Sequence, residues 1–303
     1  MKHRFFTLDV FTDRAFGGNQ LAVFPDAAAV PVERMQDIAR EFNFSETVFV
    51  LPSEDPAHAR KVRIFTPGAE LPFAGHPTVG TAHLLAATGA VPTVEGDNSF
   101  VLEEGVGPVR VSVRKEQGAV VFAQLSVAQL PERLDSGHSL DEIAEALSLS
   151  REDFAEDDVG PVALSCGVPF MFARLRDADA VGRAELNYPA WKRAFTKRGT
   201  NELFFFAEGG QLPSADLHGR MFAPGLGVLE DPATGWAVAA LAGYLVALQQ
   251  PADGTAKWTV EQGVEMGRPS LLYLEADISE GAISGVRVGG QSVVVTEGLM
   301  EIS

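Results

Sequence analysis

The sequence contains a single cysteine, Cys166, no run of basic residues and no long apolar stretch. One cysteine excludes an intramolecular disulfide and any metal site built from several thiolates. No stretch approaches the roughly 18 apolar residues that a membrane span requires, and the first residues lack the apolar core of a signal peptide. We therefore expect a cytoplasmic protein that neither crosses nor enters a membrane.

Basic residues are scarce, since 24 Lys and Arg stand against 41 Asp and Glu, a net charge of −17. Proteins that bind nucleic acids usually show a basic patch, so the composition argues against a nucleic-acid partner. The same charge repels anions at long range, so an anionic substrate would need a locally positive site. With 303 residues, 46% of them hydrophobic, the chain has room for two domains with cores of their own.

Two similar stretches each precede an apolar run of helical character. They are Gly75-His76-Pro77-Thr78-Val79-Gly80-Thr81 and Glu230-Asp231-Pro232-Ala233-Thr234-Gly235-Trp236. We expect His76 and Asp231 to cap the two helices, with proline at the first helical position. Because a helix N-terminus offers unpaired N–H groups and positive potential, two such starts predict a receptor for an anionic substrate.

Three motifs of the first half recur in the second half, in the same order and at nearly one offset. They match Ser45–Phe49 with Thr200–Phe204, Ile64–Gly68 with Met221–Gly225, and His76-Pro77 with Asp231-Pro232. In this matching Glu46 corresponds to Asn201. Such a long period predicts two pseudo-equivalent domains, residues 1–127 and 128–303, and leaves open a return of the last strand to the first half.

Each half is predicted to combine many strands with one helix that is apolar on nearly every side. Strands are expected at 5–12, 21–25, 61–66, 161–174, 270–275 and 292–296, with a meander at 99–124 and a turn at Gly289-Gly290; helices are expected at 31–44, from 76, from 139 after a capping box, and at 188–197. A helix that is apolar all round must be buried. The fold class is therefore α+β, with each half a barrel-like sheet wrapped around a central helix, and the cleft between halves is the expected ligand site.

Three titratable residues of different kinds, Glu46, His76 and Asp231, fall in the repeated motifs. Proton transfer requires such a set: a base, a group that returns the proton, and dipoles that stabilise developing negative charge. Near a helix start His76 is expected to be neutral and Asp231 ionised, while the aromatic neighbours of Glu46 favour a raised pKa. The structural alternatives are a helix cap for Asp231 and a solvated strand residue for Glu46.

Other residues are weaker candidates. Asn19 lies in a glycine turn, where a structural role is common, and with Gly75, Gly235 and Trp236 at the helix starts it completes the candidate substrate-binding set. Cys166 is expected to be a small buried hydrophobe, and His83 a core or rim histidine. The remaining histidines, His3, His58, His138 and His218, show no metal-ligand spacing, so we expect no metal site.

At these motifs the chain resembles the phenazine-biosynthesis PhzF-like isomerase family. The matching segments are Asp9-Val10-Phe11 with Gly18-Asn19, Ser45-Glu46-Thr47, Phe73-Ala74-Gly75-His76-Pro77-Thr78, Glu230-Asp231-Pro232-Ala233-Thr234-Gly235, and Gln262-Gly263 with Gly267-Arg268-Pro269-Ser270. The resemblance implies the fold shared with diaminopimelate epimerase and proline racemase, a homodimer, and cofactor-free proton-shift chemistry. It also implies that the family's acid/base glutamate falls on Glu46, and its site histidine and aspartate on His76 and Asp231.

Two departures from the relatives' pattern bear on the substrate. The racemase and epimerase relatives carry a cysteine at each helix start, where this chain has His76 and Asp231, so a two-thiol racemisation is excluded. Within the PhzF-like family a serine usually follows the glycine of the second motif, where this chain has Trp236. Because an indole removes that small hydroxyl and fills volume, we expect a changed substrate preference.

The sequence therefore predicts a cofactor-independent isomerase that acts on a small carboxylate-bearing substrate. Glu46 would move a proton between carbon positions, and His76 with Asp231 would orient the substrate or relay protons. The alternative is a non-catalytic small-metabolite-binding protein on the same scaffold, in which Trp236 fills the old site. A structural or partner-binding protein would leave the three unlike residues unexplained.

Overall fold

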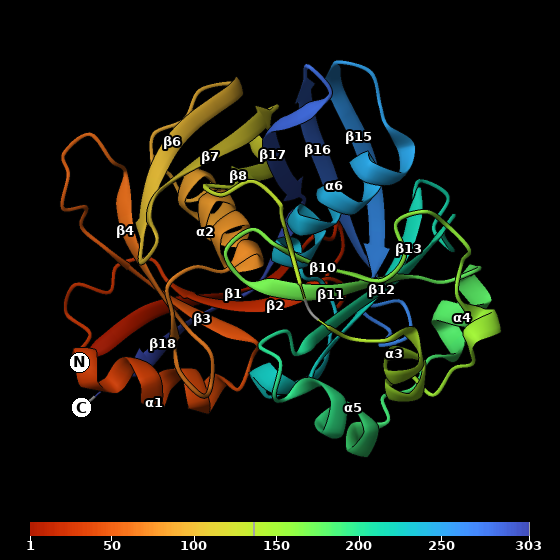
Figure 1. Ribbon diagram of the computed structural model, residues 1–303. Coiled ribbons are helices and arrows are strands. Elements are labelled where there is room, and N and C mark those ends of the chain that lie inside the picture. Colours follow the sequence, from red (N-terminus) through yellow and green to blue (C-terminus); the bar gives the residue numbers. More distant parts are fainter. Residues whose placement is uncertain (136, 303) are drawn as a thin grey trace. The chain divides into compact units, whose positions relative to one another are not determined.

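The computed structural model describes residues 1–135 and 137–302, which form two compact units dominated by β-sheet (Figure 1). The first unit is Met1–Ser126 with Val288–Ser303, and the second is Val127–Arg287. The mixed α and β fold class predicted from the sequence is confirmed. Within the described residues, no helix combines the length and the apolar character needed to cross a membrane.

The first unit is built mainly of β-strands that pair side by side. Its strands are β1 (Lys2–Val10), β2 (Asn19–Phe24), β3 (Glu46–Leu51), β4 (Arg60–Phe65), β5 (Glu70–Leu71), β6 (Gly96–Glu104), β7 (Gly107–Glu116), β8 (Ala119–Ser126) and β18 (Ser292–Glu301). β18 runs antiparallel to β1 along its whole length, so the end of the chain belongs to this unit. Helix α1 (Val32–Phe42) packs on β3 and β4, over a core that contains Phe24, Phe49 and Phe65.

Helix α2 (Gly75–Ala87) lies at the centre of the first unit. Every residue from Gly75 to Ala86 is buried, and the helix contacts β1, β2, β3, β7, β8 and β18. This is the expected outcome for a helix that is apolar on all sides, because no face can be left in water. The predicted sheet wrapped around a central helix is confirmed for this unit.

The second unit contains more helix. Its elements are β9 (Glu132–Leu134), α3 (Leu140–Ala146), η1 (Arg151–Asp153), β10 (Val162–Ser165), β11 (Pro169–Arg174), α4 (Ala178–Arg183), α5 (Tyr188–Phe195), β12 (Glu202–Glu208), β13 (Leu217–Ala223), η2 (Pro224–Leu226), β14 (Val228–Asp231), α6 (Gly235–Gln249), β15 (Gly254–Gln262) and β16 (Ser270–Ser279); β17 (Ala282–Gly290) spans the division between the units. Helix α6 is central and largely buried, and it contacts β9, β10, β11 and β16.

The two units repeat the same order and sense of strand pairing. In the first, β1/β2 is antiparallel, β2/β3 parallel, β3/β4 antiparallel, β4/β6 parallel and β6/β7 antiparallel. The second shows the same series in β10/β11, β11/β12, β12/β13, β13/β15 and β15/β16. The repeat of motifs in the sequence is therefore a repeat of topology.

The pairing register corrects one predicted correspondence. Thr47 pairs with Phe65 in the first unit, and Leu203 pairs with Phe222 in the second. Since Phe65 and Phe222 are matched in the repeat, Thr47 corresponds to Leu203, and Glu46 corresponds to Glu202. The prediction that Asn201 is the counterpart of Glu46 is wrong by one residue. One residue matters in a strand, because neighbouring side chains point to opposite faces.

The predicted helix starts are also wrong in detail. Helix α2 begins at Gly75 after Ala74, so His76 and Pro77 lie inside its first turn. Helix α6 begins at Gly235 after Thr234, and Asp231 is the last residue of β14. The chain remains extended at Asp231 because this residue pairs with Met221 across β13 and β14. Neither His76 nor Asp231 is thus the cap residue, and neither proline occupies the first helical position.

Smaller differences concern the strands. The predicted strand 161–174 is two strands, separated by a turn in which Gly167 has φ 116, a backbone conformation that favours glycine. Gly289 and Gly290, predicted as a turn, end strand β17. The capping box at α3 is confirmed, because Ser139 Oγ accepts from Glu142 N (3.3 Å) and Glu142 Oε2 accepts from Ser139 N (2.9 Å).

Candidate functional site

In the first unit, Asn19, Glu46 and His76 come together. His76 Nε2 lies 3.3 Å from Glu46 Oε2, and His76 Nδ1 lies 3.3 Å from Asn19 Nδ2. Asn19 begins β2 and Glu46 begins β3, and because these strands are parallel their first residues lie at the same edge of the sheet. The first turn of α2 presents His76 to that edge. The two predicted residues Glu46 and His76 are therefore neighbours.

His76 is a neutral imidazole near pH 7. The residue is 5% exposed, and burial lowers its pKa to about 3. Neutrality agrees with the prediction, but its main cause is desolvation by the surrounding core. His83, further along the same helix, is also buried, with its pKa lowered to about 4, which fits the prediction of a core histidine.

The N-terminal turn of α2 is fixed from behind by Thr78 and Glu104. Thr78 Oγ1 lies 2.7 Å from Ala74 O and 2.7 Å from Glu104 Oε1. Ala74 O also accepts from Thr78 N (3.3 Å), so the hydroxyl proton of Thr78 is available to Glu104. Burial raises the pKa of Glu104 to about 8, against the opposing hydrogen bond of Thr78. Glu104 is thus a neutral carboxylic acid near pH 7.

In the second unit, Asp231 is held in a loop that precedes α6. Thr234 Oγ1 donates to Asp231 Oδ2 at 2.5 Å. Gln262 spans the loop, because its Nε2 donates to Asp231 O (2.7 Å) and its Oε1 accepts from Thr234 N (3.0 Å). Gln262 was recognised in the sequence only as part of the family motif, and the structure gives it a specific contact on each side of Pro232 and Ala233.

Trp236 lies in the first turn of α6 and is half-buried. Its Nε1 donates to Cys166 O at 3.1 Å, so the indole is anchored on the turn between β10 and β11. The ring packs close to this turn, since a Cβ at position 167 would lie in van der Waals contact with Trp236 Cζ2, at 3.5 Å. Cys166 is buried, and burial raises the pKa of its thiol to about 12, as expected for an inert small hydrophobe.

Glu202 is a residue that the sequence interpretation missed. It occupies in β12 the place that Glu46 occupies in β3, and it is 5% exposed. Its Oε2 has no hydrogen-bond partner among the residues that the structure describes, and burial raises its pKa to about 7. Only the strand pairing identifies it, because the offset between Phe65 and Phe222 taken alone would match Glu46 with Leu203. Each unit therefore carries a carboxyl at the same point of its sheet.

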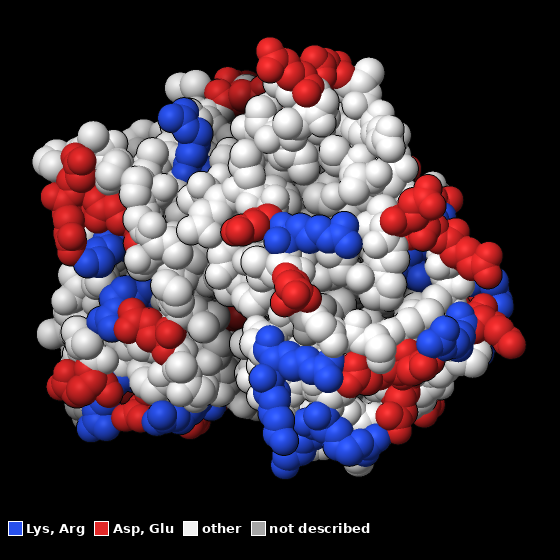
Figure 2. Space-filling view, in the orientation of Figure 1, with Lys and Arg blue, Asp and Glu red and all other residues white. Residues whose placement is uncertain are grey.

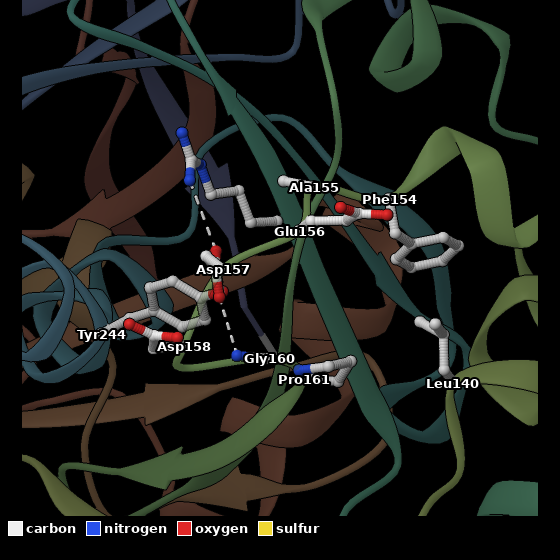
Figure 3. A pocket seen from close by; sticks show the side chains of 10 residues that line it. Leu140, Phe154, Ala155, Glu156, Asp157, Asp158, Gly160, Pro161 and Tyr244 are labelled. Atoms are coloured by element: carbon white, nitrogen blue, oxygen red, sulfur yellow. Dashed lines mark hydrogen bonds and ion pairs between the residues drawn. The ribbon is translucent and has the colours of Figure 1, made fainter.

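Two cavities are lined mainly by other residues. One, of about 470 Å³ in the second unit, is lined by Leu140, Phe154–Asp158, Gly160, Pro161, Arg174 and Tyr244 (Figure 3). Its central carboxylate is Asp157, which accepts from Gly160 N (2.8 Å) and from Tyr244 Oη (3.1 Å). The other, of about 680 Å³ in the first unit, is lined by Lys61, Arg63, Glu70 and Glu104 among others. Neither has Glu46, His76 or Asp231 among its described lining residues.

Charge on the surface shown in Figure 2 is mixed in sign, with Lys and Arg gathered over α5. Two basic residues in and just after α5 contact carboxylates of α3, since Arg193 lies 2.7 Å from Glu145 and Arg198 lies 2.9 Å from Glu142. In residues 1–135 and 137–302, no three His, Cys, Asp or Glu side chains are gathered as a metal site would require.

Comparisons with known proteins place these motifs in context. The pattern of the family described as "phenazine biosynthesis-like protein" matches residues 8–298. An uncharacterized isomerase of Mesorhizobium japonicum is 41% identical over 298 residues, 97% of each chain. The trans-2,3-dihydro-3-hydroxyanthranilate isomerase of Pseudomonas aeruginosa is 34% identical over 297 residues, 98% of each chain. The crystal structure of a PhzF-family phenazine biosynthesis protein from Bacillus anthracis has a TM-score of 0.89 at 25% identity, with both chains covered completely.

Proposed function

The chain belongs to the family of phenazine biosynthesis-like proteins and is an isomerase, and within that class we propose that it moves a proton on a small carboxylate-bearing substrate without a cofactor. Glu46 removes a proton from one carbon and returns it to another. His76 and Asp231 orient the substrate or relay protons. A proton lost at one carbon and gained at another changes no oxidation state, so the reaction balances without an oxidant or a reductant.

The observation that carries this proposal is the contact of Glu46 with a neutral His76 (3.3 Å). A carboxylate beside a neutral imidazole is a good acid/base pair, because the ring has one N–H to donate and one lone pair to accept. Glu46 is 15% exposed at its side chain and can therefore meet a ligand while still being partly desolvated. Asn19, at the other ring nitrogen of His76, fixes the orientation of the imidazole.

Anion binding is assigned to the helix starts. The first turn of a helix has backbone N–H groups that find no partner within the helix, together with the positive end of its dipole. Gly75 in α2 and Gly235 in α6 are the first residues of such turns, and their small size lets a carboxylate approach the backbone. We assign substrate contacts to these glycines, to Asn19 and to Trp236.

Asp231 contributes a carboxylate that is already oriented. Thr234 and Gln262 hold both its side chain and its main chain, which is the kind of support that keeps a substrate-orienting group in one geometry. The rival function, a metabolite-binding protein without chemistry, is not favoured, since relatives that share the whole length of the chain are named isomerases.

The test is the substitution Glu46→Gln, with Glu41→Gln in α1 as a matched control. The first compound to assay is trans-2,3-dihydro-3-hydroxyanthranilate, the compound in the relatives' name, followed by related cyclic carboxylates. Loss of an acid/base group costs about 10²–10⁴-fold in kcat. We expect that loss in Glu46→Gln and wild-type kcat in Glu41→Gln. Full turnover by folded Glu46→Gln would contradict the mechanism.

A homodimer in the cytoplasm is part of the same proposal, and it rests on the resemblance to the family. Light scattering coupled to size-exclusion chromatography should give twice the 32.3 kDa of one chain. A mass of one chain at micromolar concentration would contradict the dimer without affecting the proposed chemistry.

A further inference from the structure

We infer that His218 is a positioning residue for Asp231: as a buried cation it joins two carboxylates whose segments hold the Asp231 loop from both sides. This inference rests on the proposed role of Asp231 in the reaction. All of the residues involved belong to the second unit. The sequence predicted a role for Asp231 alone, although Glu230 and Gln262 lie in the family motifs.

His218 has a carboxylate at each ring nitrogen. Its Nδ1 lies 2.6 Å from Glu261 Oε1, and its Nε2 lies 2.9 Å from Glu265 Oε1, while the side chain itself is completely buried. A neutral ring has only one N–H, so one of these contacts would then set a lone pair against a carboxylate. Only the imidazolium donates to both. Burial alone would lower the pKa of His218, but the hydrogen bonds and charges of Glu261 and Glu265 outweigh burial and raise it to about 9.

The first arm of this arrangement runs through β15. His218 and Glu261 are direct neighbours across β13 and β15. Glu261 also accepts from Gln211 N (2.6 Å) and Leu212 N (2.7 Å), so its carboxylate is fully engaged. The next residue is Gln262, whose side chain contacts Asp231 O and Thr234 N. Fixing Glu261 therefore fixes the residue that spans the Asp231 loop.

The second arm runs through Arg220, which shares a face of β13 with His218 because the two are separated by one residue. Glu265 Oε2 lies 3.8 Å from Arg220 Nε, and Arg220 binds both carboxylate oxygens of Glu230, at 2.8 and 3.0 Å. Glu230 is the residue before Asp231. Arg220 Nη1 also donates to Val181 O and Ala184 O at the end of α4, which anchors the guanidinium.

The charges of this cluster explain why the proton on His218 matters. Three carboxylates, Glu230, Glu261 and Glu265, face two cations, Arg220 and His218. Loss of the proton would leave three carboxylates, of which Glu261 is completely buried, with one cation and would turn one of the two histidine contacts repulsive. The groups that face His218 come from β13, β15 and the segment after β15, with Glu230 of β14 acting through Arg220. Deprotonation therefore loosens one or both arms and releases Asp231.

The first experiment follows amide hydrogen exchange in the wild-type chain, in His218→Gln and in His58→Gln. The control also removes a histidine that contacts a glutamate, since His58 Nδ1 lies 3.0 Å from Glu103, but it lies in the first unit. At pH 7.5 we expect exchange of residues 230–238 to rise at least about tenfold in His218→Gln, the factor for losing one hydrogen bond to a charged group. His58→Gln should leave this segment unchanged. No change in His218→Gln, or an equal rise throughout the chain, would overturn the inference.

The wild-type chain gives a second test that needs no variant. Exchange of 230–238, corrected for intrinsic rates and compared with residues 75–87, should lose protection between about pH 8 and pH 10, as the imidazolium with a pKa of about 9 titrates. Constant relative protection over this range would contradict the inference even if His218→Gln fails to fold.

Kinetics distinguish this inference from the proposed function. With a turned-over substrate, kcat of the wild type should fall above about pH 9, and His218→Gln should show a low kcat without that fall, whereas a purely structural role would not remove the alkaline limb. If no candidate carboxylate is isomerised, the proposed function fails and hydrogen exchange still decides the role of His218. If Glu46→Gln is inactive but 230–238 is unaffected in His218→Gln, the inference on His218 fails alone.

Discussion

Glu104 provides a quantitative test of the electrostatics behind the candidate site. Its carboxyl contacts Thr78 in the first turn of α2, and its burial favours the protonated acid. The substitution Glu104→Gln keeps the size of the side chain and a donor toward Thr78, but it removes the titration. The variant should therefore fold as the wild type does and differ from it in how stability depends on pH.

The sign and size of the effect follow from the pKa of Glu104, which burial raises to about 8 from 4.5. An acid whose pKa is raised on folding stabilises fully below its unfolded pKa, and that contribution is lost as pH rises towards the folded pKa. Between pH 5 and pH 7 the unfolded carboxyl ionises and the folded carboxyl does not. Over this range the wild type should lose about 2.5 kcal/mol of unfolding free energy relative to Glu104→Gln.

The assay is urea unfolding of both chains at pH 5 and pH 7, with Glu103→Gln as a control. Glu103 accepts from Glu54 N (2.8 Å) and Asp55 N (2.7 Å), and these hydrogen bonds hold its pKa below the usual range. The difference in unfolding free energy between Glu103→Gln and the wild type should be nearly constant above pH 5. Glu103 is then ionised in both the folded and the unfolded chain. If the difference in unfolding free energy between Glu104→Gln and the wild type is also the same at pH 5 and pH 7, Glu104 is ionised in the folded protein and the reasoning fails.

Two further substitutions test separate features. Trp236→Ser should enlarge the space beside the Cys166–Gly167 turn and shift kcat/KM among cyclic carboxylates towards larger ones; an identical ranking of substrates would contradict a role of Trp236 in specificity. Ser139→Ala removes the side-chain acceptor of Glu142 N, keeps the backbone N–H that donates to Glu142 Oε2, and should lower the free energy of unfolding by about 1 kcal/mol, measured by urea unfolding. An unchanged value would mean that the cap contributes nothing there.

The features predicted correctly from the sequence are those that depend on residues close to one another in the chain. The apolar composition of α2 and α6 on every side indicated two buried helices, and the recurrence of short motifs indicated two similar units. The capping box at Ser139 and Glu142 is likewise confined to four successive residues. Such patterns need no knowledge of what packs against them.

The errors come from long-range pairing. Whether Asn201 or Glu202 matches Glu46 depends on how β12 meets β13, which no local pattern reveals. Asp231 lies in a strand because it pairs with Met221, although the following proline and apolar run resemble a helix start. The cluster around His218 was not predicted either, because Glu261 and Glu265 are distant from His218 in the sequence. The pairing of β13 with β15 brings Glu261 to the imidazole, and the segment after β15 brings Glu265.

The role of Glu46 is tested most directly by deuterium incorporation from solvent into the substrate. In D₂O, the wild type acting on trans-2,3-dihydro-3-hydroxyanthranilate or another turned-over carboxylate should yield product with deuterium bound to carbon, or return labelled substrate. Glu46→Gln should incorporate at least about 10²-fold more slowly, with Glu41→Gln equal to the wild type. Deuterium incorporation at the wild-type rate in Glu46→Gln would show that another group carries the proton.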